Sequence, residues 1–356
     1  MTKDLYDKNG RPDFDKIEPL AGVLNILIGG RRIGKTFGCF AHWVKTRPGQ
    51  FLYVRSSKNA VEKVFNAQLS PLSPINAKLG TDLQPVRVPD CTDIIAVYEA
   101  GEERDKKGRP VIRGLPVGYA VSIQDIAAVR GFNLDGVTDI IYDEFIRHPG
   151  EIVRSYRDLH TMYHDLYITV NNERETSRGV EPVRSWLLGN SDNLDNPILT
   201  SWHLVSRILQ LKAAGGNYDY DAKRGIAIFL FSDAPIKERF KKGKVARLLE
   251  GTEYYDMAYE NDFVNDDLTN CGLQAVGQYS PLFTYNQYVV STHKRHERIY
   301  VYRGRASGVP SYTSGKISRE AMLDDFGRLY YVLLGGCMYF DCYETKLEIL
   351  AAFKWI

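Results

Sequence analysis

The segment Gly29–Thr36 constrains the fold of this chain more than any other part of the sequence. It reads Gly-Gly-Arg-Arg-Ile-Gly-Lys-Thr and fits the pattern G-x-x-x-x-G-K-[ST]. The apolar run 23–28 directly before it predicts a buried strand, and apolar residues at helical spacing from Phe37 to Val44 predict a helix behind it. A phosphate-binding loop (P-loop) requires this order of strand, loop and helix. The sequence therefore predicts an α/β domain built around a P-loop.

This loop would hold the phosphates of a nucleotide. Glycines allow backbone N–H groups to converge on phosphate oxygens, and the following helix adds the partial positive charge of its amino terminus. Lys35 would bind the β- and γ-phosphates, and the Thr36 hydroxyl would bind a magnesium ion. We therefore predict ATP and Mg²⁺ as cofactors. The predicted nucleotide-binding residues are Gly29, Gly30, Arg31, Arg32, Ile33, Gly34, Lys35 and Thr36.

A second motif, Ile140–Glu144, is an apolar strand that ends in two acids. Asp143 would bind the magnesium ion through water, and Glu144 would be the base that polarises the attacking water. P-loop kinases and GTPases do not need a carboxylate at the position of Glu144, whereas motor ATPases with an extra strand in the sheet do. The long interval between Lys35 and Asp143 leaves room for that strand. The two acids therefore favour an ATP hydrolase over a small-molecule kinase.

A ring motor also needs a polar side chain that senses the γ-phosphate and a cation that arrives from the neighbouring subunit. Asn190 follows the predicted strand 186–189 and is the candidate sensor, with a turn-forming Asn as the alternative. Arg174, Arg178 and Arg184 all lie between a long predicted helix and that strand, and Arg174 is the first choice for the arginine finger. The alternative for Arg174 is a surface ion pair with Glu173 or Glu175, which is worth at most about 1 kcal/mol.

The rest of the pattern predicts several domains. Strands 51–55 and 137–142 alternate with helices, as in a mainly parallel sheet. A long helix is predicted over 152–166, and the Pro-rich stretch 70–89 is predicted to be a loop. The pattern changes after about residue 210. We predict a P-loop ATPase domain over 1–210, a small helical linker over 211–265 and a C-terminal α+β domain over 266–356.

Composition narrows the function further. Charged residues make up 25% of the chain, no apolar run approaches the about 18 residues that cross a membrane, and the N-terminus lacks the apolar stretch of a signal peptide. We therefore expect a cytoplasmic protein without a membrane partner. The five cysteines form no CxxC pair, and His160 and His164 lie in no HExxH pattern. The sequence thus predicts neither a disulfide framework nor a zinc site.

Several segments resemble one family, the DNA-packaging (encapsidation) ATPases of small short-tailed bacteriophages, or podoviruses. The resemblance covers most of the chain, and the last two segments that carry it are more specific than a general P-loop signature. These segments are Asn25–Gly29 with Ile33–Lys35, Gln50–Arg55, Asp143–Arg147 and Arg247–Tyr254.

The resemblance implies a fold, a function and partners. Members look like a P-loop ATPase of the ASCE class, which has the extra strand and the catalytic Glu, followed by a small linker. Their C-terminal domain resembles an RNase H-type nuclease that has lost its catalytic acids. They assemble as a homopentameric ring on the portal of an empty procapsid and pump double-stranded DNA inward. The resemblance also implies a location in the host cytoplasm, transiently at the portal vertex and not in the mature virion. It leaves open whether a structural RNA helps to dock the ring.

Three further residues become of interest through the resemblance, namely Arg55, Lys58 and Arg130. Lys58 would face the central pore and bind DNA phosphates without reading sequence. Arg130 would act across the subunit interface. Where the family shows an Arg-x-Arg-Glu pattern, this chain reads Asn172–Glu175 and retains only the second arginine, Arg174.

Three functions remain open from the sequence. The leading hypothesis is an ATP-driven motor that translocates double-stranded viral DNA into a procapsid. A P-loop ATPase that moves protein during secretion or assembly would share the same core. A DNA-binding ring subunit whose ATP is structural is the non-enzymatic alternative. Stimulation of ATP turnover by double-stranded DNA separates the first from the other two.

Overall fold

The computed structural model of this chain divides into two compact units. Unit 1 comprises Met1–Ile198 and Gln210–Asn265, and unit 2 comprises Leu199–Leu209 and Asp266–Ile356. The residues that the structure describes are 1–66, 68–88, 91–101, 103–106, 111–125, 129–146, 158–191, 194–252, 255 and 268–353.

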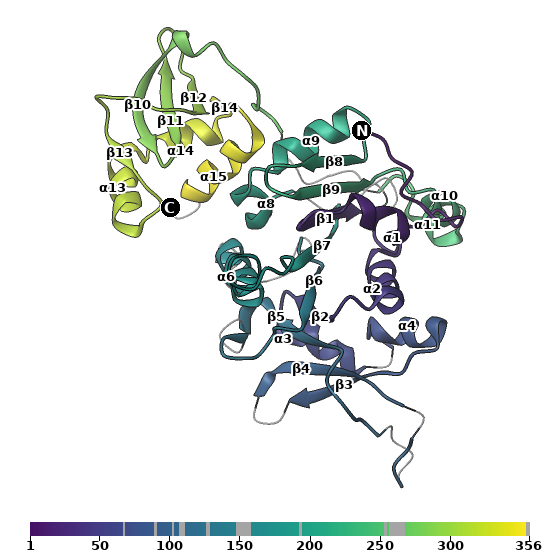
Figure 1. Ribbon diagram of the computed structural model, residues 1–356. Helices are drawn as coiled ribbons and strands as arrows, with labels where there is room; N and C mark the ends of the chain where they lie inside the picture. The colour runs from purple at the N-terminus through teal and green to yellow at the C-terminus, as the bar shows by residue number, and fades with distance from the viewer. Residues whose placement is uncertain are drawn as a thin grey trace. The chain divides into compact units, whose positions relative to one another are not determined.

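Unit 1 is built on a large, mainly parallel sheet (Figure 1). Its strands are β1 Leu24–Gly29, β2 Gln50–Arg55, β3 Leu83–Val88, β4 Cys91–Glu99, β5 Gly118–Ser122, β6 Val137–Asp143, β7 Arg184–Asn190, β8 Tyr218–Asp221 and β9 Ile226–Phe231. They lie in the order β3-β4-β5-β2-β6-β7-β1-β9-β8, with nine strands in one sheet. The strands from β5 to β9 in this order are parallel, whereas β3, β4 and β8 pair antiparallel at the edges. The predicted mainly parallel α/β architecture is therefore confirmed.

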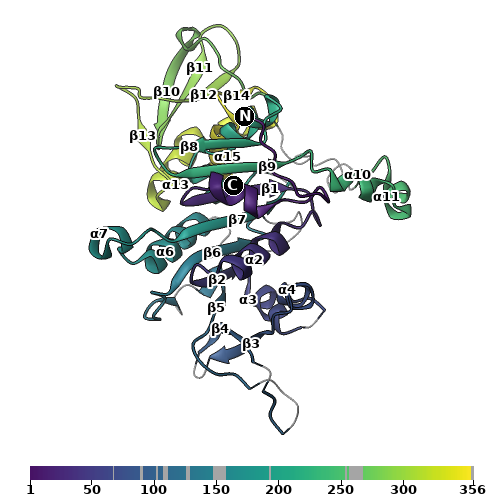
Figure 2. The same ribbon diagram turned by 45° about the vertical axis from the view of Figure 1, so that its right-hand side comes forward.

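Helices cover both faces of this sheet. The described helices that lie wholly in unit 1 are α1 Phe14–Ile17, α2 Lys35–Thr46, α3 Lys58–Glu62, α4 Leu72–Leu79, α6 Leu159–Asn171, α7 Arg174–Arg178, α10 Ile236–Lys241 and α11 Lys244–Leu249. Residues of unit 2 occur in α8 Pro197–Ser201 and α9 Val205–Ala213. In both views α2 and α6 lie on opposite faces of the sheet (Figures 1 and 2). No helix among the described residues is long and apolar enough to span a lipid bilayer.

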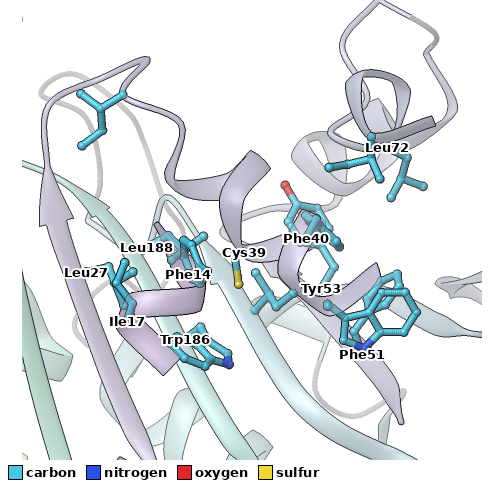
Figure 3. Packing of buried hydrophobic residues seen from close by; sticks show 14 of the residues in the cluster. Phe14, Ile17, Leu27, Cys39, Phe40, Phe51, Tyr53, Leu72, Trp186 and Leu188 are labelled. Atoms are coloured by element: carbon cyan, nitrogen blue, oxygen red, sulfur yellow. The ribbon is translucent and has the colours of Figure 1, made fainter. Parts of the chain in front are cut away.

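An aromatic-rich core fills the space between α1, α2, α4 and one face of the sheet (Figure 3). Phe51 of β2 is fully buried and lies edge-on to Phe40 and Trp43, with ring centroids 5.2 and 4.8 Å away. These two partners are three residues apart in α2, so they share the helix face that is turned to the sheet. Edge-to-face aromatic pairs add stabilisation beyond the area that they bury. This packing fixes α2, and with it the loop that precedes α2, against the sheet.

The observed elements differ from the sequence prediction in two places, and a third prediction lies partly outside the described residues. The stretch 70–89 is not all loop, because it contains α4 and β3. Its prolines are compatible with both, since Pro74 lies in the first turn of α4 and Pro85 lies in a strand at the sheet edge. The linker was predicted over 211–265. Its first part instead contains β8 and β9, which belong to the sheet of unit 1. The helix predicted over 152–166 is observed from Leu159, and its first residues lie outside the described residues.

Unit 2 has a smaller mixed sheet with its own core. Its strands are β10 Tyr279–Tyr285, β11 Tyr288–His293, β12 Ile299–Arg303, β13 Ser311–Tyr312 and β14 Met338–Phe340, in the order β13-β10-β11-β12-β14. Its helices from residue 316 onward are α13 Lys316–Phe326, α14 Leu329–Leu334 and α15 Tyr343–Phe353. Phe283, Val301 and Phe340 are buried in the core that these elements form. Unit 2 therefore buries apolar side chains of its own rather than forming an extended tail.

Gly118 provides a test of the packing around Phe51. The two residues are paired in the β2–β5 register, and a Cβ atom added to Gly118 would lie 2.5 to 2.6 Å from the Phe51 ring. We expect Gly118→Ala to lower the free energy of unfolding by about 1–3 kcal/mol, because the ring is held between two aromatic partners and has no room to shift. Urea denaturation measures this change. Gly101→Ala adds the same methyl group where nothing lies within 4 Å, and it should leave stability unchanged or slightly raised.

Candidate active site

The carboxyl ends of four parallel strands meet at one edge of the large sheet. Gly29 ends β1, Arg55 ends β2, Asp143 ends β6 and Asn190 ends β7. This edge is where open α/β sheets bind their ligands. We expected the extra strand between the two motifs to come from the interval that separates them in sequence. It is instead β7, which follows the second motif in the chain and pairs Asn190 with Gly29.

The loop between β1 and α2 is shaped by one left-handed glycine. Gly34 has a φ of +102°, which L side chains rarely adopt, and it directly precedes α2. The Lys35 side chain turns back into the loop, where Nζ donates to the carbonyl oxygens of Gly29 and Gly30, both at 2.8 Å. Nζ also donates to Asn190 Oδ1 at 3.3 Å. The predicted lysine and the predicted sensor therefore lie side by side.

The two predicted magnesium ligands are in direct contact. Thr36 Oγ1 donates to Asp143 Oδ1 at 2.9 Å, and Asp143 is only 7% exposed. A hydroxyl and a carboxylate are the hard oxygen donors that Mg²⁺ prefers. Among the residues that the structure describes, no group of three or more His, Cys, Asp or Glu side chains could hold a metal ion. This donor set therefore suits a Mg²⁺ ion that takes its remaining ligands from phosphate and water.

Arg55 holds both acids of the second motif. Its Nη1 lies 3.3 Å from Asp143 Oδ2, and its Nη2 pairs with Glu144 Oε2. The Tyr53 hydroxyl accepts from Arg55 Nη1 and donates to Asp143 Oδ2, both at 3.1 Å. Burial lowers the pKa of Arg55, but Tyr53, Asp143 and Glu144 together raise that pKa above its usual value, so the guanidinium stays charged.

Glu144 differs from Asp143 in its surroundings. Its backbone has a φ of +55°, which is uncommon for a residue other than glycine, and its side chain is 52% exposed. Asp143, its neighbour in sequence, is buried. One acid is thus fixed within the protein for binding, while the other can contact water.

Arg174 does not lie where we predicted it. We expected a side chain that a neighbouring subunit could reach, or an ion pair with Glu173 or Glu175. Arg174 is instead buried, and its guanidinium donates to three backbone carbonyls of its own chain. These acceptors belong to Asp135, Val137 and Glu181, at 3.1, 2.9 and 3.1 Å.

The acceptors also fix the position of Arg174 along the sheet. Val137 is the first residue of β6, whereas Asp143 is the last. A strand of this length spans about 20 Å. Arg174 therefore lies at the opposite edge of the sheet from the acids of its own chain, and its observed role is to tie α7 to the amino ends of β6 and β7.

Two other cations implied by the resemblance are exposed. The Arg130 side chain is 63% exposed and forms one ion pair, with Asp165 at 3.2 Å. Lys58 begins α3 directly after β2, is 47% exposed and pairs with Asp93. Exposed pairs of this kind contribute at most about 1 kcal/mol each, so Arg130 can exchange its described partner at low cost. Nothing in the local sequence marks these two residues, because exposed Lys and Arg are common on any surface.

Comparison with protein families and curated proteins finds phage packaging proteins. The model of the family described as podovirus DNA encapsidation protein (Gp16) matches residues 92–329, more than half of the chain. The DNA packaging protein of Bacillus phage B103 is 26% identical over 247 residues, which covers 68% of this chain and 65% of that protein. The DNA packaging protein of Bacillus phage phi29 is 23% identical over 270 residues, which covers 75% of this chain and 68% of that protein. The chain thus aligns with about two thirds of the length of these relatives.

Solved structures share the fold along nearly the whole chain. The phi-28 gp11 DNA packaging motor has a TM-score of 0.65 at 14% identity and covers 98% of this chain and 99% of its own. The motor assembly that packages the genome of bacteriophage phi-29 has a TM-score of 0.61 at 19% identity, and the match covers 99% of this chain and 100% of that chain. These two similarities extend over both units.

The environment of Arg174 predicts a structural effect when it is replaced. Arg174→Met keeps an apolar stem of similar length but leaves the three carbonyls without a donor, so we expect the free energy of unfolding to fall by about 2–3 kcal/mol. Arg178 is the matched control, because it forms a single, partly exposed ion pair with Asp135 at 2.8 Å. Arg178→Met should cost about 1 kcal/mol or less. Chemical denaturation of both variants measures the difference, and equal stability would return Arg174 to the list of available cations.

Proposed function

The chain belongs to the podovirus DNA encapsidation protein (Gp16) family, and on this premise we propose that it hydrolyses ATP to drive double-stranded viral DNA into an empty procapsid. The observation that carries the ATPase part is the meeting of Lys35, Thr36, Asp143 and Asn190 at one edge of a parallel sheet. Its relatives from phages B103 and phi29 are DNA packaging proteins, which supports DNA as the polymer that is moved.

We propose that unit 1 is a P-loop ATPase of the ASCE class. The strand order supports this class, because β7 separates the loop strand β1 from the acid strand β6. Glu144, directly after Asp143, supports it as well. A kinase or GTPase of the P-loop class would not need this second acid.

The residues around the loop fit ATP with Mg²⁺. Backbone amides of residues 29–36 and the amino end of α2 would hold the phosphates. Lys35 would exchange its carbonyl partners for β- and γ-phosphate oxygens, and Asn190 beside it would contact the γ-phosphate. Thr36 and Asp143 would hold the ion, with Asp143 binding through water. Bound Mg²⁺ supplies charge neutralisation on the phosphate oxygens.

Glu144 is proposed as the general base. It would orient a water molecule toward the γ-phosphate and accept its proton. In this structure Arg55 pairs with one carboxylate oxygen of Glu144, and the side chain is 52% exposed, so the other oxygen can act on water. Arg55 would thereby position Glu144, while Asp143 keeps its own contacts.

The working form is proposed to be a homopentameric ring at the procapsid portal in the host cytoplasm. The similar fold of two packaging motors supports an assembly of this type. Lys58, exposed at the start of α3, is the proposed DNA contact. It lies three residues after Arg55, the last residue of β2. Unit 2 from residue 266 is proposed to be a nuclease-like domain of RNase H type that binds DNA or the portal instead of cleaving DNA. The linker would then be confined to residues between β9 and residue 266.

Replacement of Glu144 tests the proposed function. Glu144→Gln removes the base but keeps the size and polarity of the side chain. We expect ATP affinity to stay within a few-fold and turnover to fall by roughly two orders of magnitude or more, as positioned general bases contribute that much. Steady-state ATPase assays with and without double-stranded DNA measure this. Wild-type turnover should rise with DNA, and rise further with empty procapsids.

The outcomes separate the alternatives. ATP turnover that does not change when double-stranded DNA is added would contradict a packaging motor and favour an ATPase that moves protein. Undiminished turnover of Glu144→Gln would remove Glu144 from the mechanism. ATP that is bound and never hydrolysed by the wild type would favour a structural nucleotide.

Arg130 is now the first candidate for the cation that acts in trans. A guanidinium supplied by a neighbour is worth about 10³ to 10⁵ in rate where it has been tested. If Arg130 has this role, Arg130→Ala subunits and Lys35→Ala subunits, each nearly inactive alone, should regain ATPase activity when they are mixed. Some interfaces then combine an intact loop with an intact arginine.

The control for this mixing experiment is Arg178→Ala, which removes another exposed arginine and should be active on its own. Native mass spectrometry establishes that mixed rings form. Mixed rings without recovered turnover would contradict the role of Arg130.

A further inference from the structure

A second cationic side chain lies against the loop 29–36. Arg11 belongs to the segment before α1, and a Cβ atom added to Gly34 would lie 3.2 Å from Arg11 Nη1 and 3.7 Å from its Cδ. Gly34 directly precedes Lys35 and is the N-cap of α2. The guanidinium is therefore adjacent to the backbone of the proposed phosphate-binding loop. No sequence motif pointed to Arg11, because it is a lone arginine in a polar stretch.

The main chain around Arg11 is fixed from two sides. Asp7 Oδ1 accepts from the backbone N–H groups of Asn9 and Arg11, at 2.8 and 2.9 Å. The Asp7 N–H donates to the Arg11 carbonyl at 2.8 Å. Gly10 packs against Ile236, whose N–H donates to the Gly10 carbonyl at 3.2 Å. A hydrogen-bonded turn over residues 7–11, which also contacts Ile236, thus positions Arg11 against the loop.

The segment continues along the helix that begins at the loop. The Pro12 carbonyl and the Phe14 ring lie against Gly38, one turn into α2, since a Cβ atom there would lie 3.4 Å from the carbonyl oxygen and 2.8 Å from the ring. Phe14 is buried in the core beside Cys39 (Figure 3). Asp15 pairs with Lys45 further along α2. The segment from Arg11 to Asp15 therefore follows α2, with Arg11 at its amino end.

Arg11 has no anionic partner within the described part of the chain. Its hydrogen bonds there are those of its backbone, and its guanidinium forms no ion pair with a described residue. A cation is disfavoured at the amino end of a helix, which carries a partial positive charge, and Lys35 adds a full charge beside it. This arrangement becomes favourable when an anion binds between these groups.

We infer that Arg11 binds the phosphate chain of the nucleotide, as a cation supplied from the same chain by the segment before the loop. The inference rests on the proposed ATPase function. The backbone of a P-loop cradles the α- and β-phosphates, and the planar guanidinium can donate to two phosphate oxygens at once. Arg11 is therefore a phosphate-binding residue that serves ATP and ADP alike, in contrast to a sensor of the γ-phosphate.

Arg11→Gln tests this inference, because it removes the charge and keeps a hydrogen-bonding side chain. We expect the dissociation constants of Mg·ATP and Mg·ADP to rise by the same factor, about tenfold or more, in isothermal titration calorimetry on the full chain. Arg11→Lys should recover part of the affinity, since it restores the charge without the planar fork. Lys8→Gln removes the same charge from an exposed position in the same turn, and its affinities should stay within twofold of wild type.

Three results would overturn the inference. The first is an affinity of Arg11→Gln for nucleotide that equals the affinity of Lys8→Gln. The second is a loss of affinity for Mg·ATP with no loss of affinity for Mg·ADP. The third is a thermal unfolding midpoint without nucleotide that falls in Arg11→Gln but not in Lys8→Gln, because Arg11 would then stabilise the fold through a partner in its own chain.

Lys35→Ala separates this inference from the proposed function. If Lys35→Ala loses ATP and Arg11→Gln does not, only the role of Arg11 fails; if the wild type binds no ATP, the proposed ATP site itself fails.

Discussion

The buried charge of Asp143 is the constraint on which the rest of the site depends. A buried carboxylate is costly unless it is paired and hydrogen-bonded. Its partners are Thr36 at the start of α2, and Tyr53 and Arg55 on the neighbouring strand β2. Tyr53 and Arg55 are two residues apart, so they face the same side of the sheet, and a shift of β2 by one residue would turn both away. One carboxylate thus couples the register of β2 and β6 to the loop in front of α2.

The parts of this site that the sequence predicts are those encoded by a few adjacent residues. The strand, loop and helix around Lys35 need only an apolar run, two or three glycines and helical spacing, and the observed bounds differ from the prediction by one or two residues. Asp143 is predicted for the same reason, since it ends an apolar run. Asn190 also ends such a run, and the structure brings it to Lys35. Because parallel strands put their carboxyl ends at one edge, residues predicted separately were expected to meet.

Features that depend on distant residues were not predictable in this way. No short pattern specifies that β7 inserts between β1 and β6, because strand order results from the packing of all the crossover helices. The burial of Arg174 was hidden for a different reason. Its acceptors are backbone carbonyls of Asp135, Val137 and Glu181. Because every residue has a backbone carbonyl, the sequence does not show which of them accept a hydrogen bond from a side chain. The sequence around Arg174 shows only two glutamates, which suggested ion pairs that are not its observed partners.

The partners that an arginine has within its own chain therefore limit what else it can do. Arg174 is itself buried and would have to leave three backbone carbonyls, one of them in a buried contact, at a cost of about 2–3 kcal/mol, so it is poorly suited to reach a neighbour. Arg130 would leave one exposed carboxylate, at a cost of at most about 1 kcal/mol. Arg11 has no described partner to leave and already lies against the loop. The sequence made Arg174 the first choice and gave no sign of Arg11, whereas the contacts of the three residues separate an arginine that stabilises the fold from two that can act on a ligand.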